Sequence, residues 1–350
     1  TMSNGPLRIE QYETVRYDIN CNPLGVPDSV TRAIMENISA VGHYPDTYYE
    51  PLRNAIASYA CCAPEHLVLA SGSSDLLRLF VALLAPKKAL LPIPSATDYE
   101  HVLSVYGCET DFYELDINQD YHLDMDDFIT HLSDTYDIVI LGNPNNPTSQ
   151  LISKADIEKL AAACKELGIA LLLDEMYIEF TENYERNTAI SLVNTYDNLI
   201  ILRSVSKFFS VPGLRLAYAI MNNETNMTII NMTATPNSIS CLTAAACTAM
   251  LEDTAYIHES HSRIFTERNL IYAAMNTNKN LRLFKPSANF ALMQILKEDV
   301  TAKSLLAHCN LKGIVLRNCE NFHGLDSHFV RFSICLLYTS PSPRDAHESR

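Results

Sequence analysis

Short apolar runs alternate with amphipathic stretches through the middle of the chain, and this alternation limits the possible folds more than any other feature. The apolar runs predict strands, in chain order at 89–93, 110–115, 138–141, 169–174, 199–203 and 216–220. The stretches between them predict helices at 75–84, 96–105, 125–132 and 154–167, the last with Ser153 and Gly168 as suitable caps. Runs such as 171–173 are apolar on both faces, as strands covered on both sides must be. The sequence therefore predicts an α/β fold with a mostly parallel sheet covered by helices.

The pattern changes after about residue 238. A long helical stretch is expected at 240–276, followed by short strands at 290–295, 313–316 and 329–333 around a helix near 301–309, which predicts a smaller α+β domain. We therefore divide the chain into an N-terminal segment that packs with the small domain (1–40), a large domain (41–238), a linking helix with the small domain (239–335) and a tail (336–350). The tail has no apolar period, and we interpret it as disordered or as an artefact of the sequence.

Charge and cysteine usage exclude several classes of function. The formal net charge of −15 argues against nucleic acid or an anionic membrane surface as the main partner, because both require clustered cations. No apolar run approaches the roughly 20 residues of a membrane helix, and no secretory signal is visible at the start. The ten cysteines form no C-x-x-C pair, so we expect reduced thiols, a cytoplasmic protein and no metal site.

The strongest motif is Ser204-Val-Ser-Lys207, which directly follows a predicted strand and precedes Gly213-Leu-Arg215. A lysine at the edge of a sheet, among small hydroxyl side chains, suits a Schiff-base lysine. Taken alone, the same motif is more often a solvated loop lysine. Further motifs decide between these two interpretations.

Three other motifs come from neighbouring strand ends. Asp174 ends a predicted strand, where ligands of α/β proteins bind, and Tyr177 follows it. Asn146 belongs to an Asn- and Pro-rich turn after another strand. The residues at 71–75, Ser-Gly-Ser-Ser-Asp, open a helix whose N-terminal N–H groups can bind a phosphate. Each of these motifs alone is usually only a turn or a helix cap.

Together, and in this order, the motifs resemble those of the pyridoxal-phosphate enzymes of aminotransferase class I/II, which have fold type I. The resemblance covers about residues 15–335, and the members of similar appearance are histidinol-phosphate aminotransferases and threonine-phosphate decarboxylases. It implies a large domain that binds pyridoxal 5'-phosphate and a smaller C-terminal domain.

The resemblance also implies roles for individual residues. Lys207 would form the Schiff base and then move the α-proton of the substrate. Asp174 would pair with the pyridine nitrogen, and Tyr177 and Asn146 would bind the 3-oxygen of the ring. The phosphate would be held by residues from two loops, namely Gly72, Ser73, Ser74, Ser204 and Arg215.

Two implied contacts concern the substrate and a second subunit. Arg331 matches the arginine that binds the substrate α-carboxylate, with Asn146 and Gly25 as further substrate contacts. Tyr44 matches the tyrosine that reaches the phosphate from a neighbouring subunit, which implies a homodimer. His43, Arg317 and His323 are candidates for additional anion contacts, although such residues are more often simply exposed.

The sequence departs from the family pattern at three places. Ala96 stands where an aromatic side chain usually stacks on the cofactor ring, which predicts looser binding unless Tyr99 or another aromatic side chain replaces it. Ser149 stands where glycine is usual, and the segment after Cys335 lacks the usual closing sequence. A catalytically impaired homologue is therefore a remote alternative.

We expect an aminotransferase of amino acid metabolism that acts on a small anionic amino acid or amine phosphate. Its co-substrate would be 2-oxoglutarate or glutamate, and its activity would resemble that of histidinol-phosphate aminotransferase. The alternative is a decarboxylase, because the stretches 18–27 and 317–326 resemble those of threonine-phosphate decarboxylase. A cofactor-sensing transcription regulator would need a basic DNA-binding segment, and the acidic composition argues against one.

Overall fold

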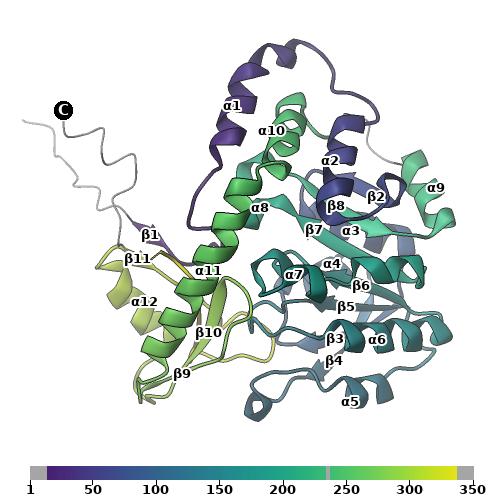
Figure 1. Ribbon diagram of the computed structural model, residues 1–350. Helices are drawn as coiled ribbons and strands as arrows, with labels where there is room; N and C mark the ends of the chain where they lie inside the picture. Colours follow the sequence, from purple (N-terminus) through teal and green to yellow (C-terminus); the bar gives the residue numbers. More distant parts are fainter. Residues whose placement is uncertain (1–13, 234–236, 337–350) are drawn as a thin grey trace, which may run out of the picture.

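In the computed structural model, which describes residues 14–233 and 237–336, a seven-stranded sheet forms the centre of the larger body (Figure 1). Its order is β2 (Leu67–Ala70), β8 (Ala217–Met221), β7 (Leu199–Ser204), β6 (Ala170–Asp174), β5 (Ile138–Gly142), β3 (Lys88–Ile93) and β4 (Glu109–Glu114). The strand β8 runs antiparallel to both of its neighbours, and the other pairs are parallel. The predicted mostly parallel sheet is confirmed, and β2 is a strand that the sequence analysis did not identify.

Helices cover both faces of this sheet because successive strand residues point to opposite sides. In β6, Leu171 and Leu173 belong to one core cluster and Leu172 to the other. The first face is covered by α2 (Glu50–Ala60), α5 (Met125–Thr130) and α6 (Lys154–Leu167), and the second by α3 (Ser73–Leu84), α4 (Thr97–Val105) and α9 (Glu224–Thr233). The predicted bounds of α6 are confirmed, with Ser153 Oγ accepting from the Asp156 N–H at 3.1 Å and Gly168 at its C-terminus.

The smaller body is built on a four-stranded antiparallel sheet (Figure 1). Its order is β12 (Arg317–Asn318), β13 (Phe329–Ser333), β10 (Phe290–Ile295) and β9 (Leu281–Leu283), with α12 (Ala302–Asn310) packed against it. The described part of the N-terminal segment reaches this body through β1 (Val15–Arg16), which pairs in parallel with β11 (Ile314–Val315). The strands predicted at 290–295 and 329–333 are confirmed.

The helical stretch at 240–276 is two helices, so the prediction of one continuous helix is wrong. It consists of α10 (Cys241–Leu251) and α11 (Thr254–Met275). The break occurs because the Asp253 carboxylate accepts from the Tyr256 N–H at 3.1 Å and caps a new helix. Nearer the N-terminus, α1 (Asp28–Glu36) packs against α10 and is followed by a 3₁₀ turn.

The remaining elements are short connections between the strands. They are α7 (Tyr184–Asn187), α8 (Val205–Phe208) and the 3₁₀ turns η1 (Ile38–Gly42), η2 (Pro64–His66), η3 (Ile117–Gln119), η4 (Ile178–Phe180), η5 (Ile190–Asn194) and η6 (Pro212–Leu214). All ten cysteines are free thiols. Within the described ranges, no helix combines the length and apolar character that crossing a membrane requires, and no group of three or more His, Cys, Asp or Glu side chains is placed to hold a metal ion. The tail beyond residue 336 lies outside the described residues.

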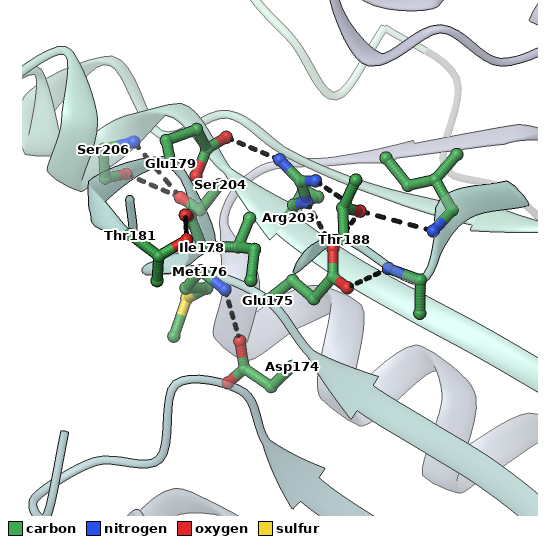
Figure 2. A network of polar contacts seen from close by, with 12 residues as sticks. Asp174, Glu175, Met176, Ile178, Glu179, Thr181, Thr188, Arg203, Ser204 and Ser206 are labelled. Carbon is green, nitrogen blue, oxygen red and sulfur yellow. Dashed lines mark hydrogen bonds and ion pairs between the residues drawn. The ribbon is translucent and has the colours of Figure 1, made fainter. Parts of the chain in front are cut away.

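A buried ionic network joins the ends of β6 and β7 (Figure 2). The Arg203 side chain donates to Glu175 at 3.0 Å and to Glu179 at 2.8 Å, and all three residues are almost fully buried. Thr188 bridges the network, accepting from Arg203 at 2.9 Å and donating to Glu175 at 2.7 Å. Burial alone would lower the pKa of Arg203, but Glu179 and Glu175 outweigh burial and raise it, so the guanidinium stays charged.

We predict that Arg203→Ala lowers the free energy of unfolding by roughly 3–5 kcal/mol, because two buried carboxylates lose their cation. Urea denaturation of the variant and the wild type measures the change. The control is Arg186→Ala, at an exposed position, which should change the free energy of unfolding by less than about 0.5 kcal/mol. Equal effects of the two substitutions would contradict the structural role given to the network.

Candidate active site

The carboxyl ends of β5, β6 and β7 bring three of the sequence motifs to one edge of the large sheet. Gly142 of β5 pairs in register with Asp174 of β6, which in turn pairs with Leu202 of β7. The Asn143 N–H, at the start of the Asn- and Pro-rich turn, donates to the Asp174 carbonyl at 2.8 Å. The edge therefore collects the turns that carry Asn146, Asp174 and Lys207, as parallel strand order requires.

Asp174 is buried and held at both carboxylate oxygens. Oδ2 accepts from the Tyr99 hydroxyl at 2.7 Å, and Oδ1 accepts from the Met176 N–H at 2.9 Å. Figure 2 shows the carboxylate on the side of the strand end opposite Arg203. Burial raises the pKa of Asp174 to about 6, although the bonds from Tyr99 and Met176 oppose this rise. A buried acid without a cation is suited to pair with a positively charged ligand.

Lys207 lies in α8, directly after the end of β7. Its Nζ donates to the Ile19 carbonyl at 2.8 Å, and its own carbonyl accepts from the Asn22 N–H at 2.9 Å. The N-terminal segment therefore crosses the site beside this lysine. Ser204 begins α8, and its Oγ accepts from the Ser206 N–H at 3.2 Å, so this hydroxyl also caps the helix.

Arg331 projects from β13 of the smaller body toward the same edge. Its Nη1 donates to Asn146 Oδ1 at 2.6 Å and its Nη2 to the Asp18 carbonyl at 2.8 Å, while Nε is buried without a partner. Both acceptors are neutral, and no ion pair involves Arg331 in the described part of the chain. Burial lowers the pKa of Arg331. A buried guanidinium with neutral partners is suited to bind an anion.

The predicted phosphate loop meets Arg215. Gly72 precedes α3 with a φ of +114°, and a Cβ at this position would lie 2.9 Å from Arg215 Cζ. Only glycine therefore allows the guanidinium to lie against the loop. Ser73 and Ser74 form the first turn of α3, and Arg215 makes no ion pair with any carboxylate that the structure describes. Arg215 Nη1 donates only to a neutral acceptor among the described residues, the Pro212 carbonyl at 3.2 Å, so the structure places a cation without a carboxylate partner beside a helix N-terminus.

Three further predicted residues lie in different surroundings. Tyr177 is buried edge-on against Phe290 at 4.8 Å between ring centroids, and the Arg331 guanidinium lies 5.5 Å from the same ring. The Gly25 carbonyl accepts from Tyr256. Tyr44 is 88% exposed. Within the described residues, no hydrogen bond or ring contact joins Gly25 or Tyr44 to Lys207 or Arg331, so their roles stay predictions.

The departures from the family pattern have local explanations. Ala96 begins α4 and packs against the core on the α3 and α4 face, where Tyr99 is also buried. The Tyr99 hydroxyl is bonded to Asp174, so this residue is committed to orienting the carboxylate. Ser149 has a φ of +60°, a conformation that favours glycine, and its Oγ accepts from the Ala288 N–H at 2.9 Å.

Sequence reasoning did not identify the contact between Tyr99 and Asp174 or the backbone acceptors of Asp18 and Ile19. Tyr99 belongs to the motif that contains Ala96, but its partner lies on a distant strand. The two carbonyls give no residue-type signal at all. These contacts depend on the tertiary arrangement of three separate segments.

Comparison with known proteins places the chain among enzymes of similar length. Residues 13–339 match the model of the family "Aminotransferase class I and II". The histidinol-phosphate aminotransferase 2 of Haemophilus influenzae is 32% identical, over 92% of this chain and 86% of its own. The threonine-phosphate decarboxylase of Salmonella typhimurium is 29% identical, over 94% of this chain and 88% of its own. The crystal structure of histidinol-phosphate aminotransferase from Clostridium acetobutylicum is 34% identical, covers 92% of this chain and 94% of its own, and has a TM-score of 0.85.

We predict that Asp174→Asn stabilises the protein at alkaline pH. The pKa of Asp174 is raised to about 6, so the stability that its proton contributes is complete below about pH 4 and is lost as the pH rises through about 6. The variant, which cannot ionise there, should gain roughly 2–3 kcal/mol over the wild type between pH 4 and pH 8.

Urea denaturation of protein stripped of bound small molecules, at both pH values, measures this gain. Asp134→Asn, at an exposed position, is the control and should show no such pH-dependent gain. A constant difference between Asp174→Asn and wild type across this range would contradict the prediction.

Proposed function

The chain belongs to the aminotransferase class I and II family, and we propose that it is a pyridoxal 5'-phosphate enzyme that transfers the amino group of a small anionic substrate. The observation that carries this proposal is the arrangement of Arg331. Its guanidinium is buried and, within the part of the chain that the structure describes, has only neutral acceptors and an Nε without a partner. Such a group requires an anionic ligand to balance its desolvation, and the carboxylate of an amino acid has the matching planar geometry.

The residues at the sheet edge fit the cofactor. Asp174 offers a buried carboxylate for the pyridine nitrogen, and Gly72 leaves the space in which Arg215 can meet a phosphate at the start of α3. Among the described residues, the Lys207 amine is bonded only to the Ile19 carbonyl. When bound, pyridoxal phosphate supplies an electron sink for the charge left at the substrate α-carbon.

The chain's own residues then have distinct tasks. The Lys207 amine binds the cofactor and moves the proton between the substrate and the ring system. Asp174 would supply the negative charge that pairs with the pyridine nitrogen. Tyr177 and Asn146 would donate to the 3-oxygen of the cofactor ring. Asn146 also bonds Arg331 at 2.6 Å, so cofactor and substrate contacts share one side chain.

A second arginine supports a phosphorylated substrate. Arg317 of β12 pairs in register with Arg331 of β13, so both side chains leave the same face of the small sheet. Directly opposed like charges are unfavourable unless something offsets them. A substrate with two anionic groups, for example a carboxylate and a phosphate, would neutralise both arginines. O-phosphothreonine carries a carboxylate and a phosphate and meets this description, whereas histidinol phosphate would neutralise the pair through its phosphate alone.

Amino transfer with 2-oxoglutarate or glutamate as co-substrate is the first candidate reaction. Decarboxylation of a phosphorylated amino acid is the second, favoured by the similarity to the Salmonella decarboxylase and by the stretch 317–326, which begins with Arg317 of β12. One site can support both outcomes, because the orientation of the substrate carboxylate decides which bond breaks.

We also include a homodimer in the proposal. Beyond Tyr44, an exposed apolar surface follows α1 and η1, with Met35, Ile38, Val41 and Tyr48 among its residues. Exposed apolar side chains gathered along one stretch of the chain are typical of an interaction surface. A second copy on this surface would bring Tyr44 to the phosphate loop of its partner. A cytoplasmic location, expected from the cysteine usage, stays part of the proposal.

Product analysis by mass spectrometry tests the reaction. The protein loaded with pyridoxal phosphate is incubated with O-phosphothreonine or histidinol phosphate, with and without 2-oxoglutarate. We expect turnover of at least one substrate that continues only when 2-oxoglutarate is present. Multiple turnovers with loss of carbon dioxide and without a keto acid would identify the decarboxylase instead. No reaction in any mixture would move the search to other amino acids and would favour an impaired homologue.

We predict that Lys207→Ala abolishes covalent capture of pyridoxal phosphate, because it removes the amine at the end of β7. Intact-mass measurement after borohydride reduction detects the adduct on the wild type. Lys165→Ala, at an exposed position that pairs with Asp197, is the control and should keep the adduct. A reducible adduct of equal yield on Lys207→Ala would place the reactive amine elsewhere.

A further inference from the structure

Tyr99 holds the carboxylate that the proposed cofactor needs. It lies in the first turn of α4, is 3% exposed, and donates its hydroxyl to Asp174 Oδ2 at 2.7 Å. In the described ranges, the other carboxylate oxygen accepts only from the backbone of its own turn, at Met176. Among the described residues, Tyr99 is therefore the side chain that fixes the orientation of this carboxylate.

The neighbouring strand leaves room for this contact. Gly142 of β5 pairs in register with Asp174, and a Cβ on Gly142 would lie 3.2 Å from the Tyr99 hydroxyl oxygen. It would also lie 3.3 Å from Asn145 Cα, where the backbone cannot easily yield. A side chain at position 142 would thus press the phenol away from the carboxylate. The glycine, the tyrosine and the aspartate form one arrangement contributed by three elements.

The charges around Asp174 show what the tyrosine supplies. Burial raises the pKa of Asp174 to about 6, Asp98 on α4 and Glu175 on the same turn add to the rise, and the bonds from Tyr99 and Met176 lower it. No cation forms an ion pair with Asp174 in the described part of the chain. Burial and the adjacent Asp174 raise the pKa of Tyr99 well above its ordinary value, so the phenol keeps its proton and remains a donor.

This inference rests on the proposed pyridoxal phosphate site. We propose that Tyr99 is a positioning residue, which keeps the Asp174 carboxylate ionised and oriented for the pyridine nitrogen, with Gly142 as the position that makes the contact possible. Because Ala96 removes the usual stacking ring, binding of the cofactor ring depends more heavily on this carboxylate. Tyr99 acts through Asp174 and need not touch the cofactor.

The experiment measures the dissociation constant of pyridoxal phosphate against pH by equilibrium dialysis. Tyr99→Phe, which removes only the hydroxyl, should weaken binding about tenfold or more at neutral pH, since a lost bond to a charged group has an effect of this order. The acid limb of the binding curve of Tyr99→Phe, where binding weakens as Asp174 takes up a proton, should move to higher pH. Gly142→Ala, which keeps both partners but displaces the hydroxyl, should shift binding in the same direction.

Two controls separate positioning from a general structural effect. Tyr136→Phe removes a tyrosine–carboxylate bond of equal length, 2.7 Å to Asp111, far from the site, and should leave the dissociation constant unchanged. In an Asp174→Asn background, Tyr99→Phe should have no further effect, because its action passes through the carboxylate.

An unchanged dissociation constant and pH profile in Tyr99→Phe would overturn the inference. It would also be overturned if Tyr99→Phe weakened binding in the Asp174→Asn background as much as it does in the wild type. Failure of the wild type to bind pyridoxal phosphate would instead refute the proposed function.

Discussion

The ion pairs of Arg203 with Glu175 and Glu179 are the interaction on which the site depends. Glu175 directly follows Asp174, and Arg203 directly precedes Ser204, so the network fixes the two strand ends that carry the proposed cofactor contacts. Successive residues point to opposite sides, which leaves Asp174 free to face the ligand while its neighbour is bonded in the core. The desolvation of these charges is offset only because every partner is in place. The rigidity of the site and the stability of the fold therefore share one set of contacts.

The fold could be predicted from the sequence wherever burial imposes a period. The runs at 138–141 and 199–203 are apolar on both faces, and each lies within one residue of a real strand. The prediction failed where a single polar contact decides the structure. Asp253 ends one helix and begins the next, yet the flanking sequence has the composition of one continuous helix. The strand β2 was not predicted from the sequence, because it is only four residues long and pairs with the distant β8.

The candidate site could be located from its motifs, but its internal bonds could not. Lys207, Asp174 and Asn146 each follow a predicted strand, and parallel strands end at one edge, so their proximity follows from the sheet. The partners of these residues come from other parts of the chain. Lys207 bonds a backbone carbonyl of Ile19, and Arg331 reaches Asn146 from the smaller body. A backbone acceptor has no residue-type signature, and a contact between two bodies depends on how they pack.

The charge of the site is opposite in sign to that of the molecule. A chain with a net charge of −15 carries Lys207, Arg331 and Arg215 in its candidate site, without an ion-paired carboxylate on either arginine in the described structure. Neutral acceptors, such as the Asp18 and Ile19 carbonyls, occupy these cations instead. An anionic ligand replaces a neutral acceptor with a charged one, and the stronger hydrogen bond contributes to the free energy of binding. A neutral ligand exchanges one neutral acceptor for another and gains little binding free energy. The proposed selectivity for anionic substrates thus rests on cations that have no carboxylate partner in the described structure.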